Sequence, residues 1–408
     1  MSDTLPAVRE TSRELAAGGQ GRARPLATAV RPLAQALRAA GTELWLDTGD
    51  RDAAAQHWGP ELSALTTNNT LVNQVIQTGR LDAALAEAAR ELKRAAGADV
   101  TEDDLVAELG FIANAQVALD LVRTFDVRVS VETHPKVAED ADATVWWARR
   151  YYELCPSHFR IKVPLTPSGC VAVRRLSSEG IPVNFTLGFS ARQNVLAARF
   201  ARPAYVNVFL GRLNSVVADN KLGSGENVGE RACLASDAQM KRIRSETGAT
   251  GPLQIAASMR GAGQLVTLAG VDVFTAPPKA FEGFLKLDIS PDEVKRYPTT
   301  ELPVEADIDL SSLWEVSEAV RTLGAAVDSR GVDTARDLVA LSMEAGVGDL
   351  FHAWTDDERA EVRADGKIPV LSKWLGRIAL DDLMTRAALE SFRVDQNALD
   401  DRIRSLLQ

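Results

Sequence analysis

The stretch His158-Phe159-Arg160-Ile161-Lys162-Val163-Pro164 decides the fold of this sequence. Apolar side chains at every second position predict a strand, with Arg160 and Lys162 on its other face. Pro164 lacks a backbone donor and is expected to end the strand. In a barrel of parallel strands, Lys162 would point inward near the catalytic rim, where burial favours a neutral amine that can form a Schiff base. Taken alone, the segment fits a solvent-exposed edge strand better, so the rest of the chain has to decide.

Eight segments carry strand signals, and amphipathic helical patterns separate them. These segments are Glu43–Asp47, Leu62–Thr66, Val127–Glu132, Phe159–Val163, Pro182–Phe189, Ala204–Leu210, Leu253–Ser258 and Val271–Thr275. Strands that alternate with helices predict an α/β protein with a parallel sheet, and eight strands are the number that closes as a (β/α)8 TIM-type barrel. An open doubly wound sheet is the alternative. No GxGxxG or GxxxxGK[ST] motif follows a strand, which weakens a nucleotide-binding interpretation.

The strand pattern stops after Phe284, and the last hundred or so residues are predicted to be all-helical. The regions that we expect are a loose N-terminal arm or frayed helix (1–24), a catalytic barrel (25–287), a linker (288–311), an extra helical insertion (312–375) and a C-terminal helix that packs on the barrel (376–408). Aromatic residues in the insertion predict a small helical core. They leave open an interface, or a lid that alters the choice of acceptor.

The composition is that of a soluble globular protein, with 46% hydrophobic and 25% charged residues. The net charge of −10 argues against nucleic acid or an anionic membrane as a partner, although a local basic pocket for a small anion is allowed. The three cysteines and four histidines show no metal-ligand spacing, so we expect no metal and no other cofactor. No apolar run approaches the roughly 20 residues of a membrane span and no secretory signal is visible, which predicts a cytoplasmic protein.

Polar side chains at the ends of the predicted strands are the candidate site residues, because catalytic side chains of β/α barrels come from these ends. They are Asp47, Asn68, Glu132, Lys162, Asn184, Thr186, Asn207 and Ser258 with Arg260, and Arg212 lies just past the sixth strand. Each one alone fits a structural role, such as a turn former or a surface ion pair. Together, two carboxylates, one lysine, neutral hydrogen-bonding groups and two arginines suit Schiff-base carbon–carbon chemistry on a phosphorylated sugar.

Seven short motifs then give the sequence a family resemblance. They are Leu46-Asp47-Thr48-Gly49-Asp50, Thr66-Thr67-Asn68, Val131-Glu132, Ile161-Lys162, Asn184-Phe185-Thr186-Leu187 with Phe189-Ser190, Phe209-Leu210-Gly211-Arg212, and Ala257-Ser258-Met259-Arg260. In this order and with these spacings, the sequence resembles the transaldolase family, class I aldolases that bind no metal. The resemblance covers about residues 43–285, and the ending Leu383–Leu407 also looks like the final helix of the family.

The resemblance implies four catalytic residues. Lys162 would form the Schiff base with C2 of a ketose. Asp47 would take the proton of the C4 hydroxyl as the C3–C4 bond breaks, and would return a proton when the acceptor aldehyde adds. Glu132 and Thr186, with a water, would move protons while the imine forms and hydrolyses. One positioned carboxylate can indeed serve first as base and then as acid.

The resemblance also implies the substrate-binding residues. Asn68 and Asn184 would hold the three-carbon intermediate through its hydroxyl groups. Arg212 and Arg260 would bind the substrate phosphate, with help from Ser258. A guanidinium fork matches two phosphate oxygens at once, which makes arginine a suitable residue for this task.

Three positions bear on how closely the chain follows the family. Asn207 stands where family members commonly have a small hydroxyl residue or alanine, and would crowd or hydrogen-bond the dihydroxyacetone moiety. Asn69 replaces the usual proline, so the loop after the second strand is expected to be less rigid. Phe209 goes with transfer between sugars, whereas a tyrosine goes with release of free dihydroxyacetone, as in the related fructose-6-phosphate aldolases.

The expected function is therefore that of a cytoplasmic transaldolase of the pentose phosphate pathway. Its partners would be phosphorylated ketose and aldose substrates, and a homodimer is left open. One alternative is a transaldolase-like biosynthetic enzyme with a different acceptor, which Asn207 and the insertion allow. A second is a lyase of the fructose-6-phosphate aldolase type. The third is a barrel that binds sugar phosphates without turning them over.

Overall fold

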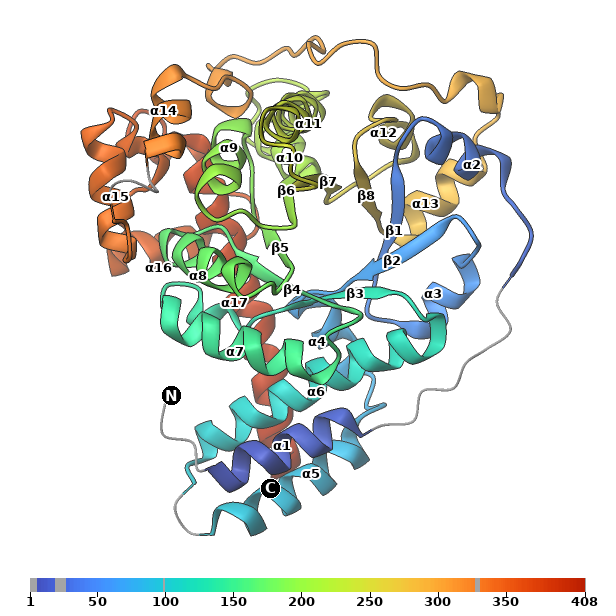
Figure 1. Cartoon of the computed structure of the whole chain (residues 1–408), viewed down its shortest axis with the longest axis vertical. Coiled ribbons are helices and arrows are strands. Elements are labelled where there is room, and N and C mark those ends of the chain that lie inside the picture. Colours follow the sequence, from blue (N-terminus) through green and yellow to red (C-terminus); the bar gives the residue numbers. More distant parts are fainter. Residues whose placement is uncertain (1–5, 19–26, 98–99, 327–330, 408) are drawn as a thin grey trace.

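The computed structural model describes residues 6–18, 27–97, 100–326 and 331–407, and its strands close into a barrel (Figure 1). The strands are β1 (Glu43–Asp47), β2 (Leu62–Thr66), β3 (Arg128–Glu132), β4 (Phe159–Pro164), β5 (Val183–Thr186), β6 (Tyr205–Phe209), β7 (Leu253–Ala257) and β8 (Val273–Ala276). Every neighbouring pair is parallel, including β1 with β8. The prediction of a (β/α)8 barrel is confirmed, and the open sheet is excluded.

The register of the barrel brings polar residues of adjacent strands to one level. Glu132 at the end of β3 lies opposite Lys162 of β4, and Lys162 lies opposite Asn184 of β5. On the other side, Asp47 at the end of β1 lies opposite Thr66 at the end of β2. Because parallel strands present their carboxyl ends at the same edge, these five side chains come from one rim of the barrel.

Three strands, β5, β6 and β7, end earlier than their apolar runs predict, and a left-handed residue follows two of them. β5 stops at Thr186 and β7 at Ala257. The next residues, Leu187 and Ser258, have φ angles of 63° and 62°. A left-handed backbone cannot continue a strand, so the chain turns here and presents the following residues at the rim.

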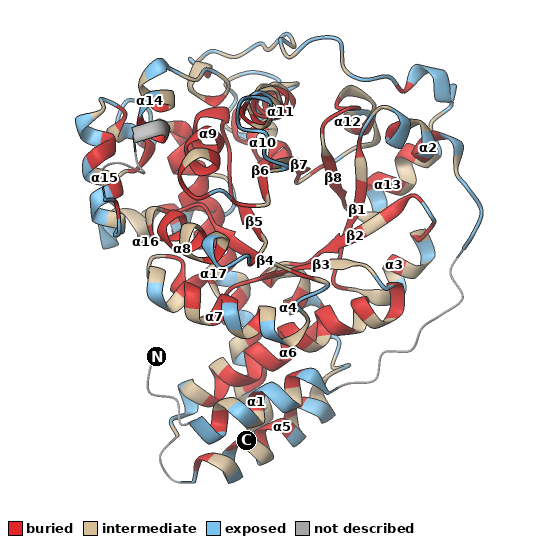
Figure 2. Cartoon of the chain, in the orientation of Figure 1, coloured by how far each residue is buried: buried red, intermediate tan, exposed pale blue. Residues whose placement is uncertain are grey.

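Helices follow the strands and form the outer layer. They are α2 (Pro32–Ala39), α3 (Arg51–His57), α4 (Asn69–Gln77), α5 (Asp82–Ala96), α6 (Glu102–Phe125), α7 (Ala141–Leu154), α8 (Pro167–Ser178), α9 (Ala191–Phe200), α10 (Leu210–Asp219), α11 (Val228–Thr247), α12 (Ala262–Thr267) and α13 (Pro278–Leu285). In Figure 2 the strands and the inward faces of these helices are buried, and their outer faces are exposed. The core therefore lies within the barrel and between it and the helices.

Helix α6 is long and apolar enough to cross a membrane by length and composition alone. Its most apolar window has a mean hydropathy of 1.5, but 83% of that window is buried inside the protein. It packs against β3 and against helices α4 and α5. Among the described residues this is the single helix that passes the test, and its burial is that of a core helix.

The N-terminal segment forms a helix, not a loose arm, over most of the residues that the structure describes. Pro6–Ala17 forms helix α1, which packs against α5 and α6. Val8, Ser12 and Ala16 are its buried residues. Their spacing of four places them on one face of the helix. Two of the three are small or polar, so this face shows only a weak hydrophobic pattern in the sequence. Residues 1–5 and 19–24 of the predicted arm lie outside the described residues.

The C-terminal region is helical, as predicted, and joins the barrel through an extended segment. The elements are η2 (Pro291–Glu293), η3 (Ser311–Leu313), α14 (Glu318–Ala326), α15 (Ala335–Glu344), η5 (Gly348–Leu350), α16 (Asp356–Asp365), η6 (Leu371–Lys373) and α17 (Leu380–Leu407). Helix α17 packs against α4, α5 and α6, and Figure 1 shows it crossing from the insertion to the α1–α5 end of the molecule. Thr385 of α17 donates to the Leu187 carbonyl, 2.9 Å away, just past β5.

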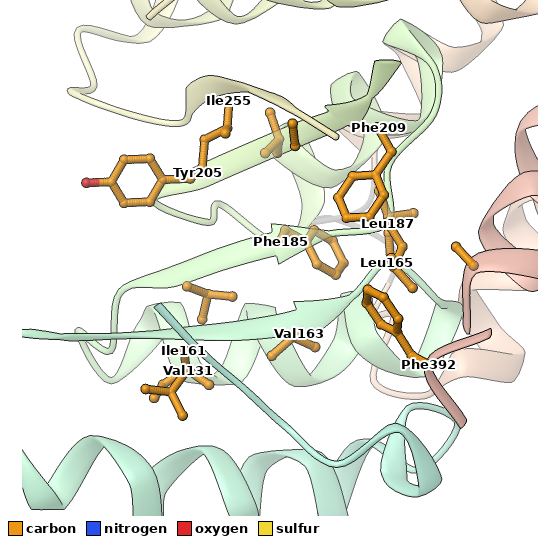
Figure 3. Close-up of a cluster of buried hydrophobic side chains, with 14 of the residues drawn as sticks. Val131, Ile161, Val163, Leu165, Phe185, Leu187, Tyr205, Phe209, Ile255 and Phe392 are labelled. Carbon is orange, nitrogen blue, oxygen red and sulfur yellow. The ribbon is translucent and has the colours of Figure 1, made fainter. Parts of the chain in front are cut away.

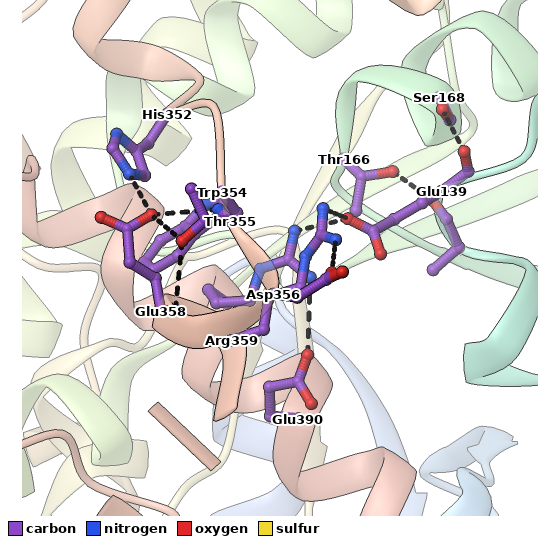
Figure 4. A network of polar contacts seen from close by, with 12 residues as sticks. Glu139, Thr166, Ser168, His352, Trp354, Thr355, Asp356, Glu358, Arg359 and Glu390 are labelled. Atoms are coloured by element: carbon purple, nitrogen blue, oxygen red, sulfur yellow. Dashed lines mark hydrogen bonds and ion pairs between the residues drawn. The ribbon is translucent and has the colours of Figure 1, made fainter. Parts of the chain in front are cut away.

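An ion network connects the insertion, α17 and the loop after β3 (Figure 4). The Glu139 carboxylate lies 3.0 Å from Arg359 of α16, 2.7 Å from Arg386 and 2.9 Å from Arg393 of α17. Burial alone would raise the pKa of Glu139, but hydrogen bonds and the charges of the arginines lower it to about 2. One carboxylate from the barrel therefore helps to hold two C-terminal helices in place.

We expect Glu139→Gln to lower the free energy of unfolding by about 1–2 kcal/mol at pH 7, a value discounted because the carboxylate is partly exposed. A carboxyl with a folded pKa of about 2 stabilises the fold above its unfolded pKa and loses this effect as the pH falls from about 4.5 toward 2. Urea unfolding between pH 7 and pH 3 measures both effects. Glu179→Gln, which removes an exposed pair with Arg149, is the control. Equal midpoints for the two variants at every pH would contradict the prediction.

Candidate active site

A cavity of about 440 Å³ opens at the carboxyl ends of the strands and contains most of the predicted site residues. Its lining includes Asp47, Asn68, Lys162, Asn184, Asn207, Phe209, Arg212, Ser258 and Arg260. Two of the predicted residues, Glu132 and Thr186, are buried and are not part of the lining. The position of the cavity is the one at which active sites of β/α barrels occur.

Lys162 reaches the cavity from β4, two residues before the strand ends. Its side chain is 5% exposed, and Nζ lies 3.0 Å from Oε2 of Glu132. Nζ also donates a hydrogen bond to the Thr67 carbonyl, 3.0 Å away. A buried amine that lines a cavity and contacts a carboxylate can lose its proton locally and attack a carbonyl carbon.

Glu132 is suited to exchange a proton with this amine. Burial, which is the largest effect, raises the pKa of Glu132, and the charge of Lys162 opposes that rise. The Oε1 atom of Glu132 and Oγ1 of Thr186 are buried and have no hydrogen-bond partner among the described residues. Buried polar groups normally find a partner, often an ordered water. The pair thus supplies groups that can hold and relay a proton through a water.

Asp47 is oriented by two threonines that the sequence analysis did not select. Thr66 Oγ1 donates to Asp47 Oδ1 at 2.7 Å, and Thr275 Oγ1 lies 2.5 Å from Thr66 Oγ1. Since the single Thr66 proton goes to Asp47, Thr275 must be the donor of the second bond. Burial raises the pKa of Asp47, while Lys162 and the Thr66 hydrogen bond oppose the rise. Threonine is common in strands, so neither residue gave a signal.

Three asparagines contribute amide groups around the cavity. Asn68 caps α4 through its side-chain oxygen, which accepts from the Leu71 amide at 2.9 Å. Asn184 donates to Ser130 Oγ at 3.3 Å, and its own oxygen is buried without a partner among the described residues. Asn207 accepts from the Gly188 amide at 3.3 Å, so its oxygen is held by the backbone. The first two can bind hydroxyl groups.

Arg212 and Arg260 converge on the cavity. Burial, and next the charge of Arg260, lowers the pKa of Arg212 to about 10. Nη1 of Arg212 is buried and unpartnered among the described residues. A Cβ on Gly211 would lie 2.1 Å from the Ser258 carbonyl and 2.9 Å from Nε of Arg260, so only glycine lets β7 and Arg260 approach α10 this closely. Two neighbouring guanidinium groups favour an anion between them.

Buried apolar side chains form a cluster near the cavity (Figure 3), and Phe209 and Phe392 of this cluster also line the cavity. Phe209 at the end of β6 stacks edge-on against Phe189, with 5.9 Å between ring centroids. Figure 3 shows Phe392 of α17 pointing toward Leu165, which follows β4. Phe392 lines the cavity, and the centroid of its ring lies 5.7 Å from the guanidinium carbon of Arg212. The terminal helix therefore contributes to the site.

Asn69 is the departure whose side chain does not line the cavity, although its neighbours Asn68 and Thr70 do. It begins α4, is 1% exposed, and its two side-chain polar atoms have no partner among the described residues. Among the residues that the sequence did not indicate are Lys367 and Ile368, which line the cavity from the insertion. A lysine in a loop about 200 residues beyond Lys162 carries no local signal of this position.

The described residues contain no group of three or more His, Cys, Asp or Glu side chains that could hold a metal. What the site offers is an amine, two carboxylic groups of raised pKa and two guanidinium groups. An amine can form an imine with a ketone, the carboxyl groups can move protons, and the guanidinium groups can bind a phosphate.

The sequence is similar to that of a known protein family and to several named relatives. Residues 44–327 match the family described as Transaldolase/Fructose-6-phosphate aldolase. A "Probable transaldolase" of Thermus thermophilus is 33% identical over 261 residues, which are 62% of this chain and 96% of the relative. A "Probable transaldolase" of Symbiobacterium thermophilum is 34% identical over 184 residues, which are 45% of this chain and 76% of the relative. A "Transaldolase" of Agrobacterium fabrum is 27% identical over 326 residues, covering 74% and 96% of the two chains.

Proposed function

Because the chain belongs to the transaldolase/fructose-6-phosphate aldolase family, we propose that it is a transaldolase that works through a Schiff base on Lys162. It transfers a dihydroxyacetone unit from sedoheptulose 7-phosphate or fructose 6-phosphate to glyceraldehyde 3-phosphate or erythrose 4-phosphate. The observation that carries the proposal is the buried amine of Lys162, 3.0 Å from Glu132, in a cavity with two converging arginines. These are the groups that imine formation on a phosphorylated ketose requires.

Binding places the substrate before any bond changes. Arg212 and Arg260 hold the phosphate at one end of the cavity, which orients the carbonyl end of the sugar toward Lys162. Asn68 and Asn184 bind hydroxyl groups near the carbonyl. Fixing the two ends of the substrate converts an encounter into an oriented reaction and can supply several kcal/mol of the barrier reduction.

Imine formation uses the Lys162–Glu132 pair. Glu132 takes the proton of the ammonium, and the neutral Nζ attacks C2 of the ketose to give a carbinolamine. Glu132 and Thr186, through a water, then return a proton to the departing hydroxyl, so that water leaves and an iminium remains. The raised pKa of Glu132 supports this role, because a protonated carboxyl group can act as the acid.

Asp47 is the group that breaks and makes the carbon–carbon bond. It takes the proton of the C4 hydroxyl, the C3–C4 bond breaks, and its electron pair moves into the iminium to give an enamine. The first aldose phosphate leaves. The enamine attacks the aldehyde of the acceptor, Asp47 returns the proton to the new alkoxide, and hydrolysis of the imine frees Lys162.

Phe209 favours transfer over release of free dihydroxyacetone. Its ring lies against Phe189 at the cavity wall and presents no hydroxyl group to position a water on the enamine. Lyase activity of the fructose-6-phosphate aldolase type is thus the less favoured alternative. A different physiological acceptor is the other one, and it is favoured by the two residues that the insertion adds to the cavity, Lys367 and Ile368.

The cellular setting is part of the proposal. The reaction would belong to the pentose phosphate pathway in the cytoplasm, with sugar phosphates as the partners and with no added cofactor. We propose no nucleic-acid or membrane partner, which the net charge of −10 supports. A homodimer is compatible with the proposal.

Borohydride treatment of the protein with fructose 6-phosphate tests the function. We expect a reduced covalent adduct on the peptide that contains Lys162, identified by mass spectrometry. No adduct would favour a barrel that only binds sugar phosphates. In a separate assay without borohydride, fructose 6-phosphate and erythrose 4-phosphate together should give glyceraldehyde 3-phosphate and sedoheptulose 7-phosphate. Release of free dihydroxyacetone at the same rate without an acceptor would identify a lyase instead.

A further inference from the structure

We propose that Lys367, carried by the C-terminal insertion, is a specificity-determining residue that binds the substrate phosphate together with Arg212 and Arg260. This inference rests on the proposed function and extends it to a part of the chain that lies outside the residues matched to the family, 44–327. Its basis is the position of Lys367 in the lining of the active-site cavity. The insertion is then a component of the active site.

Helix α10 and the insertion loop contribute separate parts of the cavity wall. Arg212, Ser215 and Asp219 recur along α10 at spacings of three and four residues, and all three line the cavity. They therefore form one face of the helix, with the buried Arg212 at its start and the exposed Asp219 at its end. Lys367 and Ile368 also line the cavity, and Lys367 is exposed. A phosphate that moves toward Arg212 would meet the ammonium at the entrance.

The loop that carries Lys367 is tied to the helix that carries Arg212. Asn220, at the end of α10, donates to the Pro369 carbonyl at 3.0 Å and accepts from the Leu371 amide at 2.8 Å. These two bonds fix the backbone two to four residues beyond Lys367. The lysine and Arg212 are thus presented by one connected piece of structure.

A second set of bonds holds the loop from within. Asp365, which ends α16, accepts from the Val370 amide at 3.0 Å and from Trp374 Nε1 at 3.3 Å. It also pairs with Lys373 at 2.5 Å. Gly366, which lies between Asp365 and Lys367, has a φ of 86°. This conformation favours glycine and turns the chain sharply before Lys367. The loop is closed at its base, so the backbone that carries Lys367 needs little ordering when a ligand binds.

The charges around the cavity favour an anion at this point. The charged lining residues are four cations (Lys162, Arg212, Arg260 and Lys367) and two carboxylates (Asp47 and Asp219). Among the described residues, Lys367 has no salt bridge with a carboxylate. In a chain with a net charge of −10, this is a local positive region. An ammonium contributes a mobile point charge that complements the fixed guanidinium forks.

Kinetics of Lys367→Met against phosphorylated and free sugars test the inference. We expect KM for fructose 6-phosphate and erythrose 4-phosphate to rise about tenfold, the loss of one charge-assisted contact, with kcat within about twofold of the wild type. With unphosphorylated glyceraldehyde as the acceptor, its KM should not change. The inhibition constant of inorganic phosphate, a binding measurement, should rise by a similar factor. Lys367→Arg keeps the positive charge, so its KM values and its inhibition constant for phosphate should stay close to those of the wild type.

Two further variants distinguish a direct contact of Lys367 with the phosphate from a general effect of losing a positive charge. Lys295→Met removes one positive charge from an exposed position outside the cavity and should leave every constant unchanged. Asn220→Ala removes both bonds to the loop and should raise the same KM values by a smaller factor. A wild-type KM for fructose 6-phosphate in Lys367→Met, or an equal rise with unphosphorylated glyceraldehyde, would overturn the inference. If borohydride still traps Lys162 in that case, the proposed function stands without it.

Discussion

Lys162→Met is expected to reduce dihydroxyacetone transfer by at least about four orders of magnitude, because the variant cannot form the covalent intermediate. Methionine is close to lysine in length and fits a site that is only 4% exposed. The other lysine that lines the cavity, Lys367, is exposed at the entrance and cannot replace the buried amine. A coupled assay for glyceraldehyde 3-phosphate measures the loss, and borohydride should trap no adduct.

Loss of the amine also leaves Glu132 without its cation, which could destabilise the barrel. Removing one partner of a buried pair costs about 3–5 kcal/mol when the remaining group stays charged. The double variant Lys162→Met/Glu132→Gln keeps the site neutral and should unfold at the same urea concentration as the wild type, or at a higher one, while being equally inactive. Transfer above about 1% of the wild-type rate in either variant would remove Lys162 from the mechanism.

The sequence was sufficient for the barrel because the strands are short, largely apolar runs with polar residues near or just past their carboxyl ends. The predicted bounds of β1, Glu43–Asp47, and of β2, Leu62–Thr66, are those of the structure. Two of the misplaced ends, those of β5 and β7, lie where a left-handed backbone at Leu187 and Ser258 overrides the strand propensity of the side chains. Strand order follows from the alternation with helices. Because all strands are parallel, the polar residues near their carboxyl ends lie together at one rim of the barrel.

What the sequence could not supply are contacts that depend on tertiary structure. Phe392 and Lys367 reach the cavity from α17 and from the insertion, far along the chain from the strands that form it. No periodicity or motif links them to the site. Thr66 and Thr275 were overlooked for a different reason, since their part is to orient Asp47 and threonine is ordinary in a strand. Helix α1 was expected only as a frayed helix or a loose arm, because its buried face is barely apolar.

Asp47→Asn is expected to lower kcat by about two to four orders of magnitude and to leave imine formation intact. Asparagine has nearly the same shape and can still accept the Thr66 hydrogen bond, but it cannot take the proton of the C4 hydroxyl. Borohydride with fructose 6-phosphate should therefore trap an adduct that retains the full six-carbon chain on Lys162. The mass of the adduct measures this directly. A three-carbon adduct formed at the wild-type rate would show that another group breaks the C3–C4 bond.

The pH dependence of Thr66→Val distinguishes a base from a merely structural carboxylate at Asp47. The Thr66 hydrogen bond lowers the pKa of Asp47 and so opposes the rise that burial causes. Without that bond the pKa of Asp47 rises, and because a base must be ionised, activity should be lost at a higher pH as the solution is acidified. Thr66→Ser keeps the hydroxyl and should keep the wild-type acid limb. If the acid limbs of Thr66→Val and Thr66→Ser coincide, the titrating group is not Asp47, because only Thr66→Ser keeps the hydrogen bond to that carboxylate.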